Sequence, residues 1–449
     1  METTNIKPKT IFTGDNLPIM RGINSESIDL IYLDPPFNSK TNYAAPIGSK
    51  AAGAEFKDTW TLSDVDNAWL DLIETKHPAL NRVIHAAMTN SDKSYLIYMA
   101  ARLLEMKRIL KDTGSIYLHC DTTMSHYLKL VMDAVFGKGN FRNEVVWKRT
   151  AAHNDSEIYG SIHDIILYYS KGDTPTLNEQ YQPYSDEYLK RYKHTDENGK
   201  RFLDRDLTAG SLSGGGYQYE WNGIIKIWRC PFTTMQEYHK SGKLYYTRNG
   251  TPRLKQFLDD MPGVPVQDVW IDIPPINSRA KERVGYPTQK PLALLDRIIK
   301  ASSNKDDVVF DPFCGCATTL VAADRIQRNW IGIDISAKAS ELVVERIKDD
   351  QGLFQEIIAR TDIPKRTDLG DILRYNHPKN KTQLYGEQSG YCNGCGTHFE
   401  KQHLEVDHII AENVGGTDHI ENLQLLCSHC NRVKGDRGQE YLISRLNKD

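Results

Sequence analysis

The residues Asp34-Pro35-Pro36-Phe37 could do chemistry, and they follow an apolar run at 28–33. The run predicts a strand buried on both faces, and the prolines end it because they cannot continue a hydrogen-bonded ladder. Asp34 and Phe37 are therefore expected at the carboxyl end of a sheet strand, where ligands bind in open α/β sheets. An acceptor beside an aromatic face could hold a planar exocyclic amine. The alternative is a strand with an ordinary proline turn.

A second candidate site is the segment Asp311-Pro312-Phe313-Cys314-Gly315, which reads as strand, tight turn and helix start. Gly315 would let the backbone approach a ligand, and the helix N-terminus supplies free N–H groups. The next strand ends at Asp334, where an acid can bind ribose hydroxyls. A turn of this kind with an acid about twenty residues later favours a cofactor-binding role.

Four of the eight cysteines form two pairs near the C-terminus, Cys392/Cys395 and Cys427/Cys430. Paired C-x2-C knuckles predict a structural zinc ion held by four thiolates, which a domain of about 60 residues needs in order to fold. Four free thiols are the alternative. The other cysteines are scattered, so we expect reduced thiols and a cytoplasmic protein rather than a disulfide framework.

The elements that must position these residues alternate between strand and helix at 9–37, 95–169 and 291–357. This alternation predicts an α/β fold, with a doubly wound, mostly parallel sheet. From about 170 to 283 the periodicity fades and tyrosines interleave with Lys and Arg, which suits either a DNA-reading surface or a solvated insert. We therefore expect a first domain at 1–360, a polar linker at 361–389 and a small domain at 390–449.

The composition of the 449 residues is that of a globular protein, with 39 % hydrophobic and 26 % charged residues. The net charge of −3 gives no overall basic character, so any nucleic-acid surface must be local. The N-terminus lacks the apolar core of a signal peptide, and no stretch is long enough to span a bilayer. We expect no membrane partner.

Taken in order, these segments resemble a permuted (beta-class) S-adenosylmethionine-dependent DNA amino-methyltransferase. In that family the catalytic motif comes first, then a target-recognition insert, then the cofactor motif, as in the order of Asp34-Pro35-Pro36-Phe37 and Asp311-Pro312-Phe313-Cys314-Gly315. The resemblance implies a Rossmann-like methyltransferase sheet, S-adenosylmethionine as cofactor and double-stranded DNA as partner. The target base would be flipped out of the duplex. Phe37 would stack on it while Asp34 and the Pro35 carbonyl accept hydrogen bonds from its amine.

The resemblance also implies a set of cofactor residues. Asp15 in Gly14-Asp15-Asn16-Leu17 would lie near the adenine, and 286–291 would line the methionine end. The full expected set is Asp15, Gln289, Lys290, Pro291, Asp311, Phe313, Gly315 and Asp334. The chain departs from the family at Cys316-Ala317, where Ser-Gly is frequent. An acid as first motif residue resembles adenine-N6 enzymes more than cytosine-N4 enzymes, which more often carry Ser.

The segment between and after the cysteine pairs resembles an HNH (ββα-metal) endonuclease domain, through Asp407-His408, Asn422 and Asn431. The resemblance implies that Asp407 and Asn431 ligate Mg²⁺ or another divalent cation and that His408 is the general base. Asn422 would hold the loop carrying His408. Arg432 and Lys434 are candidate phosphate contacts. The alternative is that His408 is a buried structural histidine.

The two resemblances together predict a DNA methyltransferase, most consistent with adenine N6, whose HNH nuclease module cleaves DNA in a restriction–modification setting. A second hypothesis is a solitary methylase whose C-terminal module only binds DNA. A third, methylation of RNA or a small molecule, fits the large insert and the nuclease module less well. The oligomeric state stays open, with a homodimer as one option.

Overall fold

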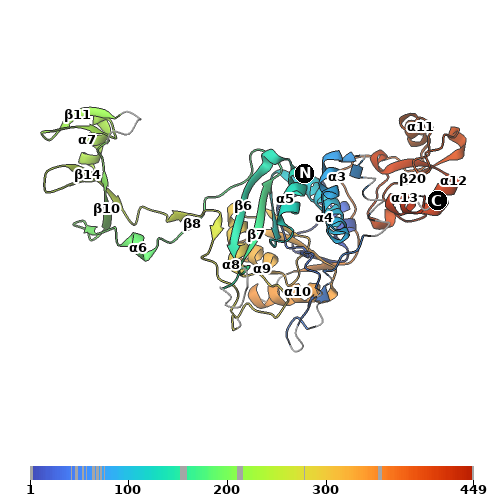
Figure 1. Cartoon of the computed structure of the whole chain (residues 1–449), viewed down its shortest axis with the longest axis horizontal. Coiled ribbons are helices and arrows are strands. Elements are labelled where there is room, and N and C mark those ends of the chain that lie inside the picture. The colour runs from blue at the N-terminus through green and yellow to red at the C-terminus, as the bar shows by residue number, and fades with distance from the viewer. Residues whose placement is uncertain are drawn as a thin grey trace. The chain divides into compact units, whose positions relative to one another are not determined.

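The protein is described here from a computed structural model that divides into two compact units, Met1–Asn178 with Gln267–Asp449, and Glu179–Val266 (Figure 1). The structure describes residues 4–41, 43–45, 49–52, 55–56, 58–62, 66, 70, 73–74, 76–151, 159–209, 216–277, 279–351 and 356–446. No helix among these residues is long and apolar enough to cross a membrane.

The larger unit is built on a nine-stranded sheet with the order β16-β6-β7-β5-β2-β17-β18-β1-β19. Every neighbouring pair is parallel except those of β7, which runs antiparallel to β5 and β6. The expected doubly wound, mostly parallel sheet is therefore confirmed. The strands are β1 (Thr10–Thr13), β2 (Ile28–Leu33), β5 (Leu110–Cys120), β6 (Phe141–Lys148), β7 (His163–Ser170), β16 (Val269–Trp270), β17 (Val308–Asp311), β18 (Asn329–Asp334) and β19 (Ile358–Arg360).

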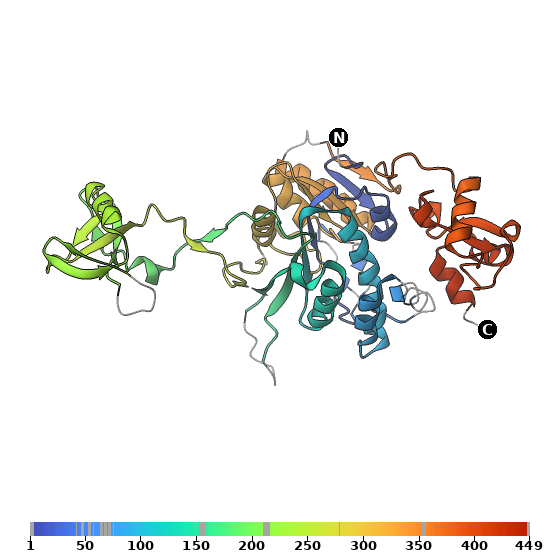
Figure 2. The same cartoon turned by 90° about the horizontal axis from the view of Figure 1, so that it is seen from above.

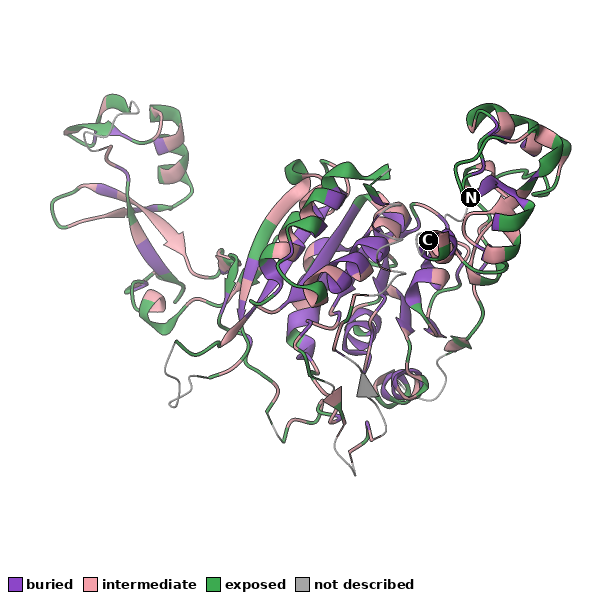
Figure 3. Ribbon diagram, turned by 45° about the vertical axis from the view of Figure 1, so that its right-hand side comes forward, coloured by how far each residue is buried: buried purple, intermediate pink, exposed green. Residues whose placement is uncertain are grey.

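The helices of this sheet form two groups, α3 with α4 and α5, and α8 with α9 and α10 (Figure 2). Their apolar sides and the strands make up the buried core, drawn in purple in Figure 3. They are α1 (Asn16–Arg21), α3 (Pro78–His85), α4 (Asn90–Ile109), α5 (Ser125–Phe136), α8 (Leu292–Ser302), α9 (Thr318–Arg325) and α10 (Ala337–Gln351). Short additional elements are β3 (Tyr43–Ala44), β4 (Glu55–Phe56) and the 3-10 turn η1 (Lys138–Asn140).

The prediction for the C-terminal end of one helix differs from the structure. The sequence predicts a helix from Ser336 to about Ile357, but Glu356 and Ile357 are not helical and β19 begins at Ile358; residues 352–355 lie outside the described part of the chain. β19 pairs with β1 and closes the edge of the sheet. A strand of only three residues, of which one is Arg360, carries too little alternation to be recognised from its pattern.

The smaller unit has its own apolar core, formed by Leu207, Trp221, Trp228, Met235 and Leu244. It lies inside the range predicted as a recognition insert. Its sheet has the order β13-β14-β10-β9, beside a β11–β12 hairpin and a β8–β15 pair. The elements are β8 (Tyr181–Gln182), α6 (Asp186–Leu189), β9 (His194–Thr195), β10 (Arg201–Asp206), β11 (Tyr217–Trp221), β12 (Ile224–Trp228), α7 (Phe232–Lys240), β13 (Leu244–Tyr246), β14 (Pro252–Phe257) and β15 (Val264–Pro265).

The C-terminal domain consists of an antiparallel β20–β21 pair with helices against it. It has a separate core that includes Leu384, Leu404, Leu425 and Leu442. The elements are α11 (Pro378–Glu387), η2 (Lys401–His403), β20 (Leu404–His408), η3 (Glu412–Val414), η4 (Ile420–Asn422), β21 (Leu423–Cys427), α12 (Ser428–Lys434) and α13 (Gln439–Leu446). The two strands followed by α12 give the ββα arrangement.

Much of the range expected as a linker, 361–389, is ordered. Helix α11 lies inside this range, and its Leu384 is buried in the C-terminal core. At the other end, the Thr367 N–H donates to Asn24 Oδ1 at 2.8 Å, and the Ser25 N–H donates to Asp368 Oδ2 at 2.9 Å. The polar composition that suggested a linker instead supplies hydrogen bonds to the sheet-bearing part.

Candidate functional site

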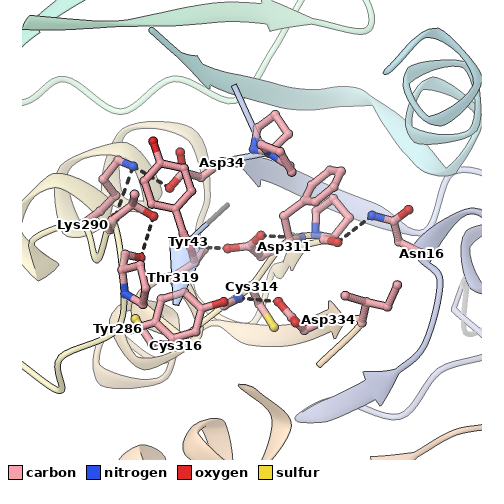
Figure 4. A pocket seen from close by; sticks show the side chains of 18 of the residues that line it. Asn16, Asp34, Tyr43, Tyr286, Lys290, Asp311, Cys314, Cys316, Thr319 and Asp334 are labelled. Atoms are coloured by element: carbon pink, nitrogen blue, oxygen red, sulfur yellow. Dashed lines mark hydrogen bonds and ion pairs between the residues drawn. The ribbon is translucent and has the colours of Figure 1, made fainter. Parts of the chain in front are cut away.

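A pocket of about 670 Å³ is lined by three carboxylates from neighbouring strands. Asp34 follows β2, Asp311 ends β17 and Asp334 ends β18. Since these strands are parallel neighbours, their carboxyl ends meet at one edge of the sheet. Figure 4 shows the three side chains at this pocket. Residues far apart in the chain thus come together where α/β folds bind ligands.

All but one of the residues expected for catalysis and cofactor binding in the first domain line this pocket. The exception is Pro291, whose extended backbone (φ −68°, ψ 143°) immediately precedes α8. The residues that line it are Asp15, Asp34, Pro35, Pro36, Phe37, Gln289, Lys290, Asp311, Phe313, Gly315 and Asp334.

The backbone after the Asp34-Pro35-Pro36-Phe37 segment is held by Asp58, a residue that sequence reasoning missed. The N–H groups of Phe37, Asn38 and Ser39 donate to the Asp58 carboxylate at 3.2, 2.7 and 2.8 Å. Asp58 is only 1 % exposed, so these charge-assisted bonds are shielded from water. They fix the loop that presents Phe37. Asp58 stands in an irregular part of the sequence, where no motif marks it.

A group of buried, hydrogen-bonded side chains supports one face of the Phe37 ring. The His119 ring is stacked on Phe37, with ring centres 6.1 Å apart and planes 21° from parallel. His119 is fully buried and contacts the Tyr32 hydroxyl at 2.9 Å and Asp164 at 3.1 Å. Burial favours a higher pKa for Asp164, but the hydrogen bond to His119 and the nearby charges of His119, Lys290 and Arg149 together lower that pKa. No motif in the sequence marks His119.

The two carboxylate oxygens of Asp34 differ in their hydrogen bonding. Oδ2 accepts a hydrogen bond from Lys290 Nζ at 2.6 Å, the contact drawn in Figure 4. Oδ1 is buried and has no hydrogen-bond partner in the described part of the chain. A buried acceptor without a donor costs about 1–3 kcal/mol, so this oxygen is suited to a donor that arrives with a ligand.

The second carboxylate, Asp311, lies at the base of the turn that follows β17. It accepts hydrogen bonds from the Phe313 N–H at 3.0 Å and from the Thr319 hydroxyl at 2.5 Å. Burial raises the pKa of Asp311 to about 7, although these two donors oppose the rise. The neighbouring acids Asp34 and Asp334 add to it. Asp311 can therefore hold a proton close to neutral pH.

The third carboxylate, Asp334, organises the same turn from the neighbouring strand. Its two oxygens accept from the Gly315 N–H at 2.8 Å and the Ser336 N–H at 2.9 Å. Burial raises the pKa of Asp334, and these two bonds oppose the rise. Each carboxylate oxygen keeps a further lone pair, which leaves room for a hydroxyl donor.

The turn itself uses two residues with positive φ. Gly315 has φ +48°, and a Cβ there would lie 3.1 Å from the Tyr286 ring. Ala317 has φ +67° and caps the start of α9. A non-glycine residue in this left-handed conformation costs about 1–2 kcal/mol. The departure from the Ser-Gly frequent in the family therefore falls on a position whose conformation favours glycine.

Asp15 is tied into the pocket by a buried arginine. Its carboxylate caps α1 by accepting from the Leu17 N–H at 3.0 Å and pairs with Arg102 at 2.8 Å. The neighbouring Asn16 donates to the Pro312 carbonyl at 2.8 Å, which joins the β1 and β17 loops. Arg102, also missed in the sequence, stands on α4 with its guanidinium 3.4 Å from the centre of the Tyr98 ring.

The four cysteines of the C-terminal domain form the only group of metal-binding side chains found among the described residues. The Sγ atoms of Cys392, Cys395, Cys427 and Cys430 all lie within 4.8 Å of one another. Burial raises the pKa of the Cys392 thiol, and the N–H groups of Cys427 and Gly394, which donate to its Sγ at 3.2 and 3.4 Å, oppose the rise. The set fits a tetrahedral zinc ion.

The residues expected to form the nuclease site surround β20 and the start of the loop after it. His408 Nε2 lies 2.7 Å from Asp418 Oδ1, and its ring lies 4.9 Å from that of Tyr375. Asn422 accepts from the Ile410 N–H at 2.9 Å and donates to the carbonyl of Ile410 at 3.0 Å. The structure thus places Asn422 against the segment that follows His408. Asp418 and Tyr375 carried no signal in the sequence.

The expected magnesium ligands are each engaged with protein groups. Asp407 Oδ2 pairs with Lys434 Nζ at 2.9 Å, and Asn431 donates to Glu405 Oε2 at 2.6 Å. Hydrogen bonds from Asn431 and Ser428 lower the pKa of Glu405. The carboxylates and the Asn431 amide oxygen are donors that suit a hard cation. Lys434 is fully buried, so the expectation that it contacts a phosphate is wrong.

Comparison with known proteins gives two family matches. Residues 28–345 match the model of the N6/N4 DNA methylase family, and residues 392–437 match that of HNH endonucleases. The type II methyltransferase M.EcaI of Enterobacter cloacae is 28 % identical, over 86 % of this chain and 80 % of the relative. The DNA adenine methyltransferase YhdJ of Escherichia coli is 24 % identical, over 81 % of this chain and 93 % of the relative.

A third relative is longer than this chain. The Mod subunit of the type III restriction-modification enzyme StyLTI of Salmonella typhimurium is 31 % identical over 83 % of this chain, and the match spans 58 % of the relative's length. The methylase model covers well over half of the chain and includes Asp34, Asp311 and Asp334. The chain therefore belongs to the DNA methylase family and carries a C-terminal HNH endonuclease domain.

Proposed function

We propose that this protein transfers a methyl group from S-adenosylmethionine to the exocyclic amine of a flipped base in double-stranded DNA, and that the base is adenine, methylated at N6. The observation that carries the proposal is the pocket in which the Asp34-Pro35-Pro36-Phe37 segment faces Asp311 and Asp334. One end offers an aromatic ring and a buried, unpartnered carboxylate oxygen, and the other a glycine turn beside two acids.

The residues at the amine end bind and orient the base. The Phe37 ring provides a stacking face whose direction is fixed by Asp58 and His119. Asp34 accepts a hydrogen bond from the amine and opposes the positive charge that grows on the nitrogen. The Pro35 carbonyl is a second acceptor for the amine. Much of the rate then comes from holding the amine in line with the methyl group.

The residues at the other end fit S-adenosylmethionine. The volume of about 670 Å³ lies within the range of small-molecule pockets, and the nearby carboxylates suit a cationic sulfonium. We expect Asp334 to bind ribose hydroxyls and Asp15 to lie near the adenine. The cofactor supplies an electrophilic methyl: a C–N bond forms as the C–S bond breaks, sulfur keeps the electron pair and the nitrogen loses a proton. Asp34 Oδ1 is the acceptor placed to receive that proton before it reaches solvent.

Two points favour adenine over cytosine. The first motif residue is the acid Asp34, which resembles adenine-N6 enzymes more than cytosine-N4 enzymes. The relative YhdJ, which matches along 93 % of its own length, is named a DNA adenine methyltransferase.

The purified chain should be incubated with labelled S-adenosylmethionine and duplex DNA of varied sequence, and the nucleosides analysed. We expect label in N6-methyladenine and none with Asp34→Ala. Label in N4-methylcytosine alone would overturn the adenine assignment, and label in neither nucleoside, with transfer to tRNA, would overturn DNA as the substrate.

We further propose that the HNH domain cleaves DNA with a divalent cation. His408 is oriented by Asp418 and its loop by Asn422. Asp407 and Asn431 would hold Mg²⁺, which polarises a phosphodiester. Supercoiled plasmid should be nicked in Mg²⁺ or Mn²⁺ and stay intact with His408→Ala. Intact plasmid with the zinc-loaded wild type in both metals would leave a DNA-binding module attached to a methylase.

For the domains, we propose a methylase at 1–360 interrupted by the recognition insert, and a nuclease domain to 449. The compact unit Glu179–Val266 is the part of the insert with a core of its own. The C-terminal domain includes α11, because Leu384 belongs to its core, so its boundary is best drawn before Pro378.

A further inference from the structure

Lys290 contacts the amine end of the pocket, although the sequence suggested the cofactor end. Its Nζ donates to Asp34 Oδ2 at 2.6 Å and lies 5.3 Å from the centre of the Phe37 ring. The lysine side chain is 10 % exposed and that of Asp34 is 18 % exposed, so the pair is largely shielded from water. A shielded ammonium needs a carboxylate partner, and Asp34 is the one it contacts.

The pairing leaves the two oxygens of Asp34 with different tasks. Lys290 holds Oδ2, while Oδ1 is buried without a hydrogen bond in the described part of the chain. If both oxygens were free, the carboxylate could rotate about its Cβ–Cγ bond and present either one. With Oδ2 held by the ammonium, the remaining acceptor has one direction. The carboxylate is therefore fixed before a base arrives.

The segment that carries Lys290 is itself anchored. Gln289 accepts from the Val284 N–H at 2.9 Å and donates to the Glu282 carbonyl at 2.6 Å. Two residues after Lys290, α8 begins at Leu292, and the Leu292 N–H donates to the Glu282 carboxylate at 3.0 Å. Lys290 thus projects from a turn braced on both sides, as a residue that must hold another in place requires.

We infer that Lys290 is a positioning residue for methyl transfer: its ammonium holds Asp34 Oδ2 so that Oδ1 meets the exocyclic amine of the target base. This inference rests on the proposed function. Lys290 also balances the charge of Asp34 in the base-free pocket. When the base enters, its amine donates a hydrogen bond to Oδ1, which otherwise has no donor.

If Lys290 acts on Asp34 and not on the cofactor, its replacement should lower kcat and leave the affinity for S-adenosylmethionine unchanged. Lys290→Met removes the charge and keeps the length of the side chain. We expect kcat to fall at least about 100-fold, as for a misplaced reacting group, while the dissociation constant for S-adenosylmethionine measured by calorimetry stays within about 3-fold of wild type. Lys290→Arg should recover part of kcat. Lys281→Met, at an exposed lysine in the same segment, should behave as wild type.

A double-mutant cycle tests whether Lys290 acts through Asp34. In the Asp34→Asn background, Lys290→Met should cause less than about a 3-fold further loss of kcat. Full kcat in Lys290→Met would overturn the inference, as would a loss explained entirely by weaker cofactor binding. If that variant does not fold, Lys290→Gln is judged by the same two measurements. A wild-type protein that methylates no DNA overturns the proposed function itself, and this inference with it.

Discussion

Asp311 should make the stability of the methylase domain depend on pH in a direction opposite to that of most acids. Its folded pKa of about 7 exceeds the ordinary value of 3.8, so the folded chain holds this proton more tightly than the unfolded chain. Stability from this group is complete below about pH 3.8 and is lost as the pH rises towards 7. Above that it changes no further.

The size of the effect follows from the two pKa values. Each unit is worth 1.36 kcal/mol, so the interval from pH 5 to the folded pKa corresponds to about 3 kcal/mol of unfolding free energy lost by pH 8. Asn is a matched replacement because it has the size of Asp and cannot titrate, and its amide oxygen can accept from the Phe313 N–H while the amide nitrogen lies beside the Thr319 hydroxyl. Asp311→Asn should therefore not lose this unfolding free energy as the pH rises.

Urea unfolding of cofactor-free wild type and Asp311→Asn at pH 5 and pH 8, followed by tryptophan fluorescence, measures the difference. We expect the variant to gain about 3 kcal/mol on the wild type between the two pH values. Asp371→Asn, at an exposed acid, serves as the control and should follow the wild type. Parallel pH profiles for wild type and Asp311→Asn would refute the assignment of the raised pKa to this carboxyl.

Three further outcomes follow from the structure. Asp58→Asn, which replaces one accepting oxygen by a donor beneath the Phe37 loop, should lower kcat on the order of 100-fold with unchanged cofactor affinity; a wild-type rate would show that the loop needs no such support. Chelation of zinc, or Cys427→Ser, should make the C-terminal domain sensitive to trypsin while methyl transfer continues; a resistant domain would mean that the metal is not structural. Ala317→Gly should stabilise the chain by about 1 kcal/mol, and Gly315→Ala should weaken cofactor binding. Thermal melts with and without S-adenosylmethionine measure both effects. Equal melts for the two variants would contradict the turn geometry.

The pocket carboxylates could be found in advance because each ends a strand with a clear apolar pattern. Asp34, Asp311 and Asp334 are separated in the sequence but share one sheet edge, and the parallel rule brings them together. The antiparallel direction of β7 could not be read from its residues, because a strand buried on both faces shows the same apolar run in either direction.

The residues that sequence reasoning missed act through contacts between distant segments. Asp58 and His119 belong to no motif, and only the folded chain brings them against the Phe37 loop. Lys290 was identified as a pocket residue, but its contact with Asp34 was not, since a motif does not say which atom a flexible side chain will reach. Helix α11 was hidden because its sequence is mostly polar, and a few residues such as Leu384 anchor it.

The attachment of Thr367 and Asp368 to the sheet-bearing part sets an upper limit to the distance between that part and the C-terminal domain. On the other side, Asn380 of α11 donates to the Arg374 carbonyl at 3.0 Å, so the stretch between the two attachments is residues 369–373. Fully extended, it spans about 17 Å, or roughly five base pairs of DNA. At such a short distance the local concentration of a tethered domain is in the millimolar range. If the HNH domain cleaves DNA as proposed, it would therefore cut the DNA molecule that the methylase binds, close to the target base.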